Sequence, residues 1–257
     1  MAIAIVSSGI GKTGGRVAEL ALAQKDLKVV SGVCSDCAKH AGSRFPLFPE
    51  GKIAEAMAGG EVFVDFSNVD AAMRNLPKAA KAGLNLVVGT TGFSDEQLAK
   101  ISQVVEENKV SAVIAPNFSV GVNLFFKFAH DMAKALSEYD VEIIECHHNK
   151  KKDSPSGTAM KAAKVVAQAL GIPESAYKFG RNGIVGPRGR EIGIHAIRAG
   201  DIVGEHTVLF AGNCEQIKLS HAAQSRDCFA SGALKAIRWV AGRRDGKVHS
   251  MNDVLGI

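Results

Sequence analysis

The chain has 257 residues, of which 46% are hydrophobic and 22% are charged, and its formal net charge is +5. This composition predicts a globular protein of one large or two modest domains. The mild positive charge suits an anionic small molecule, and a chain with one Trp and two Tyr lacks the basic, aromatic-rich stripe of a nucleic-acid-binding protein. We find no signal peptide and no apolar run of membrane length, so we expect a cytoplasmic protein without a membrane partner.

Short apolar segments alternate with helical patterns in the first half of the chain. Strands are expected at Ala2–Val6, Leu27–Cys34, Val62–Phe66, Leu86–Gly89 and Ser111–Ala115, and helices at Gly14–Gln24, Ala71–Ala82 and Asp95–Asn108. Ser94 and Gln97 form a capping box at the start of the last of these helices. This alternation predicts an α/β fold with a Rossmann-type, doubly wound parallel sheet.

A glycine-rich loop lies between the first expected strand and the first expected helix. It reads Gly9-Ile10-Gly11-Lys12-Thr13-Gly14-Gly15 and contains the pattern G-x-G-x-x-G. The glycines permit a tight turn and let a pyrophosphate reach the helix N-terminus. In this context the loop predicts dinucleotide binding, although a glycine-rich turn without a ligand has the same pattern.

Asp36 lies just after the second expected strand. An acid at this position usually accepts hydrogen bonds from the adenosine ribose and disfavours a 2′-phosphate. Neighbouring residues would weaken that preference, namely Lys12, Thr13, Lys39 and His40. We therefore expect the cofactor to be NADH or NADPH, with NADH used at least as well.

The five cysteines are Cys34, Cys37, Cys146, Cys214 and Cys228. An odd and scattered set favours reduced thiols in a cytosol. Cys34 and Cys37 form a C-x-x-C, but one such pair without a second is a weak signal for a zinc or redox site. We expect no metal site.

Two further loops end the fourth and fifth expected strands. They read Gly89-Thr90-Thr91-Gly92-Phe93 and Ala115-Pro116-Asn117-Phe118. Because the carboxyl ends of parallel strands form the ligand crevice of such a sheet, we interpret both loops as walls of the nicotinamide site. Ordinary surface loops are the alternative.

The pattern changes after Asn117, which indicates a second domain. A helix is expected at Gly121–Leu136, and strands joined by short turns at Ile192–Arg198, Glu205–Ala211 and Cys214–His221. This predicts an α+β domain with a mixed, mostly antiparallel sheet at residues 119–227. A final helix at Phe229–Arg238 is expected to pack back on the first domain, which then comprises residues 1–118 and 228–257.

The segment from Glu145 to Thr158 is the most informative part of the chain and reads ECHHNKKKDSPSGT. It joins a strand expected at Val141–Cys146 to a helix expected at Ala159–Leu170. Ser156, Gly157 and Thr158 would then lie at a helix N-terminus, where unpaired N–H groups attract carboxylate or phosphate. A histidine and a lysine beside them can move protons near neutral pH if the site lowers the lysine pKa. The combination favours reduction of a small dicarboxylate.

Each part of this segment also has a simpler interpretation. A lysine run such as Lys150–Lys152 is usually a solvated loop. His147 and His148 point to opposite sides of a strand, so a shared metal is not expected. The sequence around Ser156 also suits an ordinary helix cap.

Seven motifs spread along most of the chain occur together. They are Gly9–Gly15, Asp65–Ser67, Val88–Phe93, Ala115–Val122, Glu142–His148, Asp153–Ala159 and Ile197–Thr207. In these motifs the chain resembles the dihydrodipicolinate reductase family, also called 4-hydroxy-tetrahydrodipicolinate reductases, of diaminopimelate and lysine biosynthesis. The resemblance implies NAD(P)H-dependent reduction of this cyclic dicarboxylate to tetrahydrodipicolinate by a homotetramer assembled through the sheet of the second domain.

The same resemblance implies roles for individual residues. His147 and Lys151 match the catalytic pair, with Lys151 as the proton donor. The substrate-carboxylate cradle is matched by His148, Ser156, Gly157 and Thr158, and the cofactor wall near the nicotinamide by Gly89, Thr91, Ala115 and Phe118.

Two departures from the family pattern concern the nucleotide. Aligned on Gly9 and Gly15, this chain has Lys12 where the family has a glycine and Thr13 where it has an arginine. After the second strand it has Ser35-Asp36 where many members have an acid followed by a basic residue. The residue that meets the ribose is therefore left open.

Three other functions compete with this one. A different small-acid dehydrogenase is disfavoured by the combination of His-His, Lys and Ser-Gly-Thr. A non-catalytic NAD(P)-sensing module would leave the lysine–histidine loop without a purpose. A nucleic-acid-binding protein is disfavoured by the composition.

Overall fold

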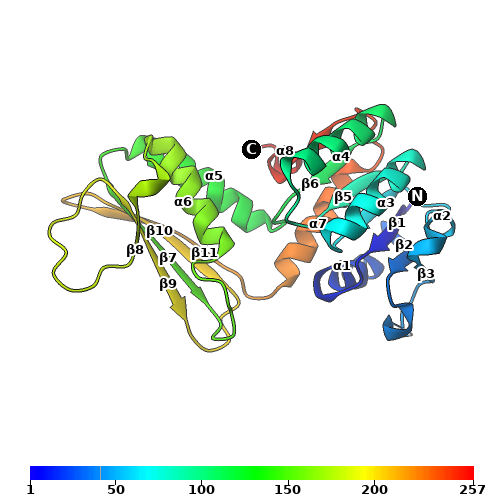
Figure 1. Ribbon diagram of the computed structural model, residues 1–257, viewed down its shortest axis with the longest axis horizontal. Coiled ribbons are helices and arrows are strands. Elements are labelled where there is room, and N and C mark those ends of the chain that lie inside the picture. The colour runs from blue at the N-terminus through cyan, green and yellow to red at the C-terminus, as the bar shows by residue number, and fades with distance from the viewer. Residues whose placement is uncertain (41) are drawn as a thin grey trace. The chain divides into compact units, whose positions relative to one another are not determined.

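The computed structural model describes residues 1–40 and 42–257. Within them the chain divides into two compact units. The first comprises Met1–Val120 and Asp227–Ile257, and the second comprises Gly121–Arg226. Each unit has its own sheet (Figure 1). Among the described residues, two hydrophobic clusters lie in the first unit and one in the second.

The first unit contains a parallel sheet, which has seven strands in the described part of the chain, in the order β12-β6-β5-β4-β1-β2-β3. The strands are β1 (Ile3–Ser8), β2 (Leu27–Cys34), β3 (Leu47–Pro49), β4 (Val62–Asp65), β5 (Asn85–Val88), β6 (Ala112–Ile114) and β12 (Val248–His249). The strand order runs in opposite directions on the two sides of β1. This is the topological switch point of a doubly wound sheet, so the predicted fold of this unit is confirmed.

Helices cover both faces of this sheet. They are α1 (Lys12–Leu22), α2 (Ile53–Ala56), α3 (Val69–Lys81), α4 (Asp95–Glu107), α7 (Asp227–Val240) and α8 (Met251–Leu255), with short 3-10 turns η1 (Cys37–His40) and η2 (Glu50–Lys52). Along β4, Val62 and Val64 enter the core with α1 and α7, whereas Phe63 enters the core with α3 and α4. Successive strand residues point to opposite faces, and both faces are buried, so Val62, Phe63 and Val64 of β4 are all apolar.

Two predictions about helices in this unit are confirmed. Ser94 and Gln97 form the expected capping box at the start of α4. The late helix α7 packs in the core of the first unit, with Ala233 and Ile237 fully buried there.

The second unit contains a five-stranded sheet in the order β11-β10-β7-β9-β8. Its elements are α5 (Val120–Ala135), β7 (Asp140–His147), α6 (Gly157–Leu170), η3 (Glu174–Ala176), β8 (Tyr177–Phe179), β9 (Ile192–Arg198), β10 (Glu205–Ala211) and β11 (Gln216–Ala222). Residues of α5 and α6, including Phe125 and Val166, pack on one face of the sheet against Ile143 and Phe210. This unit is α+β, as predicted.

The second sheet is mixed, but it contains more parallel pairing than expected. Among its described strands, β10 is antiparallel to β7 and β11, whereas β9 is parallel to β7 and β8. The connection from β7 to β9 passes through the helix α6, so β9 runs in the same direction as β7. The short strands β3, β8 and β12 were not predicted, because two or three residues show no periodicity.

None of the helices in the described part of the chain has the length and apolarity that crossing a bilayer requires.

Candidate active site

The glycine loop connects β1 to α1 in the first unit. Gly9 has a φ of +74°, and a Cβ there would lie 2.5 Å from backbone atoms of Phe66 and Ser67, so the position requires glycine. A Cβ at Gly14 would collide with the Gly9 carbonyl oxygen. By contrast, nothing lies within 4 Å of a Cβ built at Gly11, the N-cap of α1. Glycine has no side chain to cap the helix, so no N-cap side chain competes with an anion for the first N–H groups of α1.

A cavity of about 310 Å³ opens at the glycine loop. Its walls include Gly9 and Gly11, the end of β2 at Cys34 and Ser35, and the segment that follows β4. It therefore lies at the carboxyl ends of the strands beside the switch point, where doubly wound folds bind nucleotides.

Asp36 does not line this cavity, although its neighbour Ser35 does. The Asp36 carboxylate instead forms an ion pair with Lys39 at 2.9 Å, and 49% of its side chain is exposed. An adjoining cavity of about 320 Å³ is lined partly by the basic residues Lys39, His40 and Arg44. The end of β2 thus presents both an acid and several bases near the expected ribose position.

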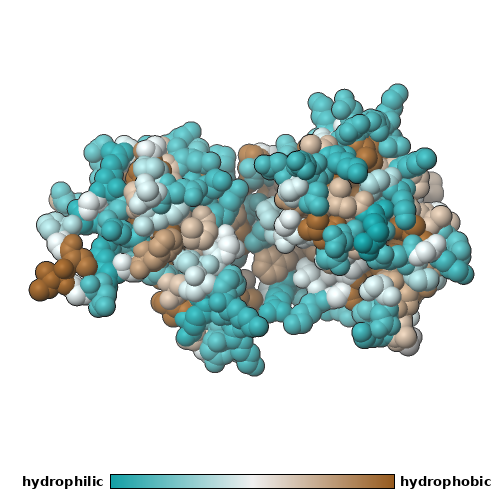
Figure 2. Space-filling model, viewed as in Figure 1, coloured by the Kyte–Doolittle hydropathy of each residue, from teal (hydrophilic) through white to brown (hydrophobic). Residues whose placement is uncertain are grey.

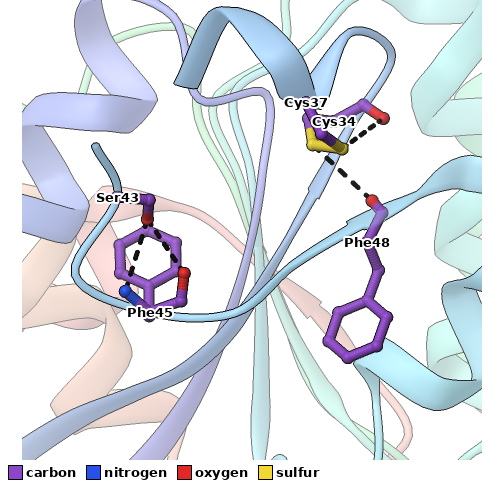
Figure 3. The surroundings of a disulfide bond; sticks show 5 residues. All are labelled: Cys34, Cys37, Ser43, Phe45 and Phe48. Carbon is purple, nitrogen blue, oxygen red and sulfur yellow. Dashed lines mark hydrogen bonds between the residues drawn. A yellow bond between two sulfur atoms is a disulfide. The ribbon is translucent and has the colours of Figure 1, made fainter. Parts of the chain in front are cut away.

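Cys34 and Cys37 form a disulfide, so the expectation of reduced thiols is wrong for this pair (Figure 3). Their Cα atoms are 5.3 Å apart, because the turn η1 brings the chain back immediately after β2. The free cysteines are Cys146, Cys214 and Cys228.

The loop after β5 contains Gly89, Thr90 and Thr91. Gly89 packs against the ring of Phe66, and Thr91 is exposed. Thr90 is 5% exposed and its hydroxyl donates to Asp65 at 2.5 Å, so its side chain supports the loop from inside.

The loop after β6 contains Ala115, Asn117 and Phe118. Ala115 and Phe118 are buried in the core of the first unit. The Asn117 side chain accepts a hydrogen bond from the Ser119 N–H at 2.9 Å. Because the side chains of Ala115 and Phe118 are buried, these two residues can contact a cofactor only through their backbone atoms.

The second unit gathers polar side chains around the end of β7. Glu145 is fully buried, and the Arg198 guanidinium donates two hydrogen bonds to its carboxylate, at 2.8 and 2.9 Å. The Ser156 N–H donates to the same carboxylate at 2.9 Å. Glu145 also shares a short hydrogen bond with Nδ1 of His147. This carboxylate therefore connects β7, β9 and the start of α6.

The strand register explains why these residues meet. Glu145 and His147 are two apart on β7 and point to the same face. In the antiparallel pairing His206 of β10 lies opposite Glu145, and in the parallel pairing Arg198 of β9 lies beside His147. The rings of His147 and His206 contact edge to face at 5.1 Å.

The N-terminus of α6 completes this cluster. Ser156 is the N-cap, and its hydroxyl accepts a hydrogen bond from the Ala159 N–H at 3.1 Å. The same hydroxyl shares a hydrogen bond of 3.1 Å with Nε2 of His206. Gly157 and Thr158 are the first two residues of the helix. The predicted helix N-terminus is thus present and adjoins the histidines.

Lys151 lies in the loop between β7 and α6. Its side chain is 21% exposed and its Nζ is 2.9 Å from Asp153. Its neighbours Lys150 and Lys152 are exposed, as a solvated loop predicts. His148 is half-buried, and its Nδ1 is buried without a hydrogen-bond partner in the described structure.

Burial and charge set the protonation of two groups in this cluster. Burial and then the nearby His147 lower the pKa of His206 to about 4, so this ring is neutral at pH 7. Burial alone would raise the pKa of the Glu145 carboxyl, but hydrogen bonds from Arg198, His147 and the Ser156 N–H outweigh it and lower that pKa. An ionised Glu145 can only accept, so Nδ1 of His147 carries the proton and Nε2 remains for a reacting group.

Ligand atoms of Glu145, His147 and His206 lie within 4.8 Å of one another, a spacing that a metal ion could use. The Arg198 guanidinium, however, contacts both oxygens of the Glu145 carboxylate. A metal ion bound there would have to displace the Arg198 guanidinium or lie beside it, and two positive charges at that distance repel each other. The cluster is therefore better suited to proton transfer than to metal binding.

The sequence did not assign roles to Glu145, Arg198, His206 or Glu50. Glu145 has a local signal, because its alternation with His147 places both on one face of a strand. Arg198 and His206 come from other strands, and Glu50 enters the wall of the first cavity next to the unpredicted strand β3. Assigning these three residues to the sites would require knowledge of how the strands pair, which the sequence alone does not give.

Models of two protein families match nearly the whole chain. Residues 1–118 match dihydrodipicolinate reductase, N-terminus, and residues 121–255 match dihydrodipicolinate reductase, C-terminus. The 4-hydroxy-tetrahydrodipicolinate reductase of Methanosarcina barkeri is 54% identical over 197 residues, covering 77% of this chain and 73% of its own. That of Methanocaldococcus jannaschii is 43% identical over 266 aligned positions, covering 98% of this chain and 96% of its own.

Solved structures have the same fold. A dipicolinate-bound dihydrodipicolinate reductase from Paenisporosarcina sp. TG-14 superposes with a TM-score of 0.79 at 26% identity, covering 97% of this chain and 98% of that one. GenD2 from gentamicin A biosynthesis, in complex with NAD, has a TM-score of 0.60 at 15% identity, covering 99% and 90%, and shares the fold alone.

A Rossmann-type unit with an open glycine loop, and a second unit with a buried His–Glu–Arg cluster at a helix N-terminus, define a two-domain oxidoreductase of the nicotinamide-dependent class. Within that class the chain belongs to the dihydrodipicolinate reductase family.

Proposed function

We propose that the protein reduces 4-hydroxy-tetrahydrodipicolinate to tetrahydrodipicolinate with NADH or NADPH. Its relatives bear the name of this reductase, and a related structure holds dipicolinate, a small aromatic dicarboxylate. The observation that carries the proposal is the Glu145 carboxylate at the end of β7, which contacts both His147 and the N–H of Ser156, the N-cap of α6. Lys151 lies in the loop between these two elements and pairs there with Asp153.

The start of α6 is proposed to bind one substrate carboxylate. The backbone N–H groups of Gly157 and Thr158 belong to the first turn and have no partner within the helix. The positive end of the helix dipole favours an anion there. His148, whose Nδ1 is buried without a partner among the described residues, is a second candidate contact.

Lys151 and His147 are proposed to handle the proton. Reduction requires loss of water from the hydroxylated ring and addition of one hydride and one proton. The nicotinamide, when bound at the glycine loop, supplies the hydride. Lys151 is proposed as the donor of the proton, and an ammonium whose contact strengthens as negative charge develops lowers the barrier. Glu145 holds His147 in one orientation through Nδ1.

An assay with both cofactors tests the reductase and its cofactor preference together. Dihydrodipicolinate synthase would generate the unstable substrate in place, and oxidation of NADH and NADPH would be followed separately. We expect NADH to give a kcat/KM at least equal to that of NADPH, because an acid, Asp36, directly follows Ser35, and Ser35 lines the nucleotide cavity. A strong NADPH preference would show that the bases at Lys39, His40 and Arg44 dominate. No substrate-dependent oxidation, from folded protein that binds nucleotide, would instead favour a non-catalytic sensing module.

The protein is further proposed to form a homotetramer through its second sheet. The face of this sheet opposite α5 and α6 carries Ile144, Ile197 and Leu209, which lie outside the core of the unit, and Ile197 is 45% exposed. Ile184 and Val185, between β8 and β9, are also exposed, and Figure 2 shows a hydrophobic cluster at the left of the view. Second copies of this chain would cover such apolar surface. Light scattering is expected to give four times the 27.0 kDa chain mass, and a monomer would contradict the proposal.

A further inference from the structure

The disulfide between Cys34 and Cys37 lies in the wall of the nucleotide cavity. Cys34 and Ser35 line this cavity together with Gly9 and Gly11 of the glycine loop. The bond closes a loop that contains only Ser35 and Asp36. The oxidation state of the two cysteines therefore acts directly on the segment where doubly wound folds recognise the adenosine ribose.

The surroundings of the pair suit a dithiol as well as a disulfide. Sγ of Cys34 lies 3.7 Å from the carbonyl oxygen of Phe48, and Sγ of Cys37 lies 3.6 Å from the carbonyl oxygen of Cys34 (Figure 3). Only a thiol can donate to these oxygens, so the reduced form has an acceptor near each sulfur. Neither state leaves a buried donor without a partner.

The two sulfurs differ in access. Cys34 is 6% exposed at the end of β2, whereas Cys37 is half-buried at the start of η1. An external thiolate would therefore attack Sγ of Cys37, and the thiolate of Cys34 would leave. If the attacking molecule is a dithiol, its second thiolate then attacks the mixed disulfide and releases Cys37. The dithiol becomes a disulfide, and the protein gains two electrons and two protons.

Asp36 does not line the cavity in the structure, in which the disulfide is closed. Its carboxylate is paired with Lys39 at 2.9 Å. This ion pair is exposed and contributes little to stability. Opening the disulfide removes the cross-link on either side of Asp36 and permits the carboxylate to turn toward the ribose hydroxyls.

We propose that Cys34 and Cys37 form a reversible dithiol–disulfide pair that sets the affinity for the dinucleotide, with the dithiol form binding more tightly. The inference rests on the proposed use of NADH or NADPH. It goes beyond that proposal in assigning a thiol-exchange site and a way to lower reductase activity under oxidising conditions.

The test compares NADH binding by the two states of the whole protein. Samples would be treated with dithiothreitol or with oxidised glutathione, and maleimide labelling followed by intact mass would count the thiols. Denatured reduced protein should label at all five cysteines, and oxidised protein at the three free ones. Fluorescence titration is expected to give a Kd for NADH about tenfold lower in the reduced state, equivalent to one hydrogen bond to a charged group.

Three variants make the test specific. Cys37→Ser cannot form the bond and should bind NADH like the reduced protein under both treatments. Cys214→Ser removes an exposed free cysteine and should respond like the unmodified protein. Asp36→Asn should still form the disulfide but lose most of the difference in Kd.

The outcomes separate this inference from the proposed function. Equal affinity in both states, or failure of the disulfide to form with oxidised glutathione, would overturn the inference while leaving the reductase proposal intact. Absence of NADH and NADPH binding in both states would instead overturn the proposed cofactor.

Discussion

Lys151→Ala is expected to lower kcat by about 10²–10⁴-fold, the usual contribution of a positioned general acid. The half-buried ammonium of Lys151 pairs with Asp153, in the loop that leads into the α6 N-terminus, where we place the substrate carboxylate. No other described lysine of this loop is similarly enclosed, since Lys150 and Lys152 are exposed. The Kd for NADH should stay unchanged, because the glycine loop is in the other unit. Steady-state kinetics and NADH titration measure the two quantities.

Lys152→Ala is the matched control, because it removes the same charge one residue away. We expect its kcat to change by less than about twofold, since exposed charges contribute weakly. If Lys151→Ala and Lys152→Ala had similar activity, the lysine run would be only a solvated loop and Lys151 would not be the proton donor.

Glu145→Gln is expected to reduce both stability and turnover. The neutral amide leaves the Arg198 guanidinium without its buried anionic partner, which typically costs about 3–5 kcal/mol in the free energy of unfolding. It also replaces the acceptor that orients His147, so kcat should fall by about 10²-fold in the protein that remains folded. Urea unfolding gives the first quantity, and kinetics normalised to folded protein give the second.

Glu205→Gln provides the comparison for this variant. Glu205 lies on β10 and pairs in register with Cys146, but its side chain is exposed. We expect a change in stability within about 0.5 kcal/mol and near-normal kcat. A Glu145→Gln protein with normal kcat, even if less stable, would restrict Glu145 to a structural role.

The sequence predicted the longer elements because periodicity and capping agree at those positions. The helix α4 has both an apolar face and the Ser94–Gln97 capping box, and β2 was predicted with its exact bounds. The parallel pairing of β9 with β7 could not be predicted from the sequence, because it depends on the path that the chain takes through α6 between the two strands. Very short strands such as β12 exist only because a neighbouring strand offers hydrogen bonds.

The site was partly visible for the same reason. The segment from Glu145 to Thr158 is local, so its strand, loop and helix N-terminus were all predicted from adjacent residues. Arg198 and His206 join it only through register across three strands. The ion pair of Asp36 with Lys39 and the Cys34–Cys37 disulfide depend on the turn η1, which no sequence signal marked.

A crystal structure with NADH and dipicolinate would test the assignment of the active site most directly. We predict one dipicolinate carboxylate on the N–H groups of Gly157 and Thr158, with Nζ of Lys151 in hydrogen-bonding range of the ligand and the NADH pyrophosphate at Gly11. Dipicolinate bound away from the α6 N-terminus, with Lys151 still paired to Asp153, would contradict the proposed site and the roles of its residues.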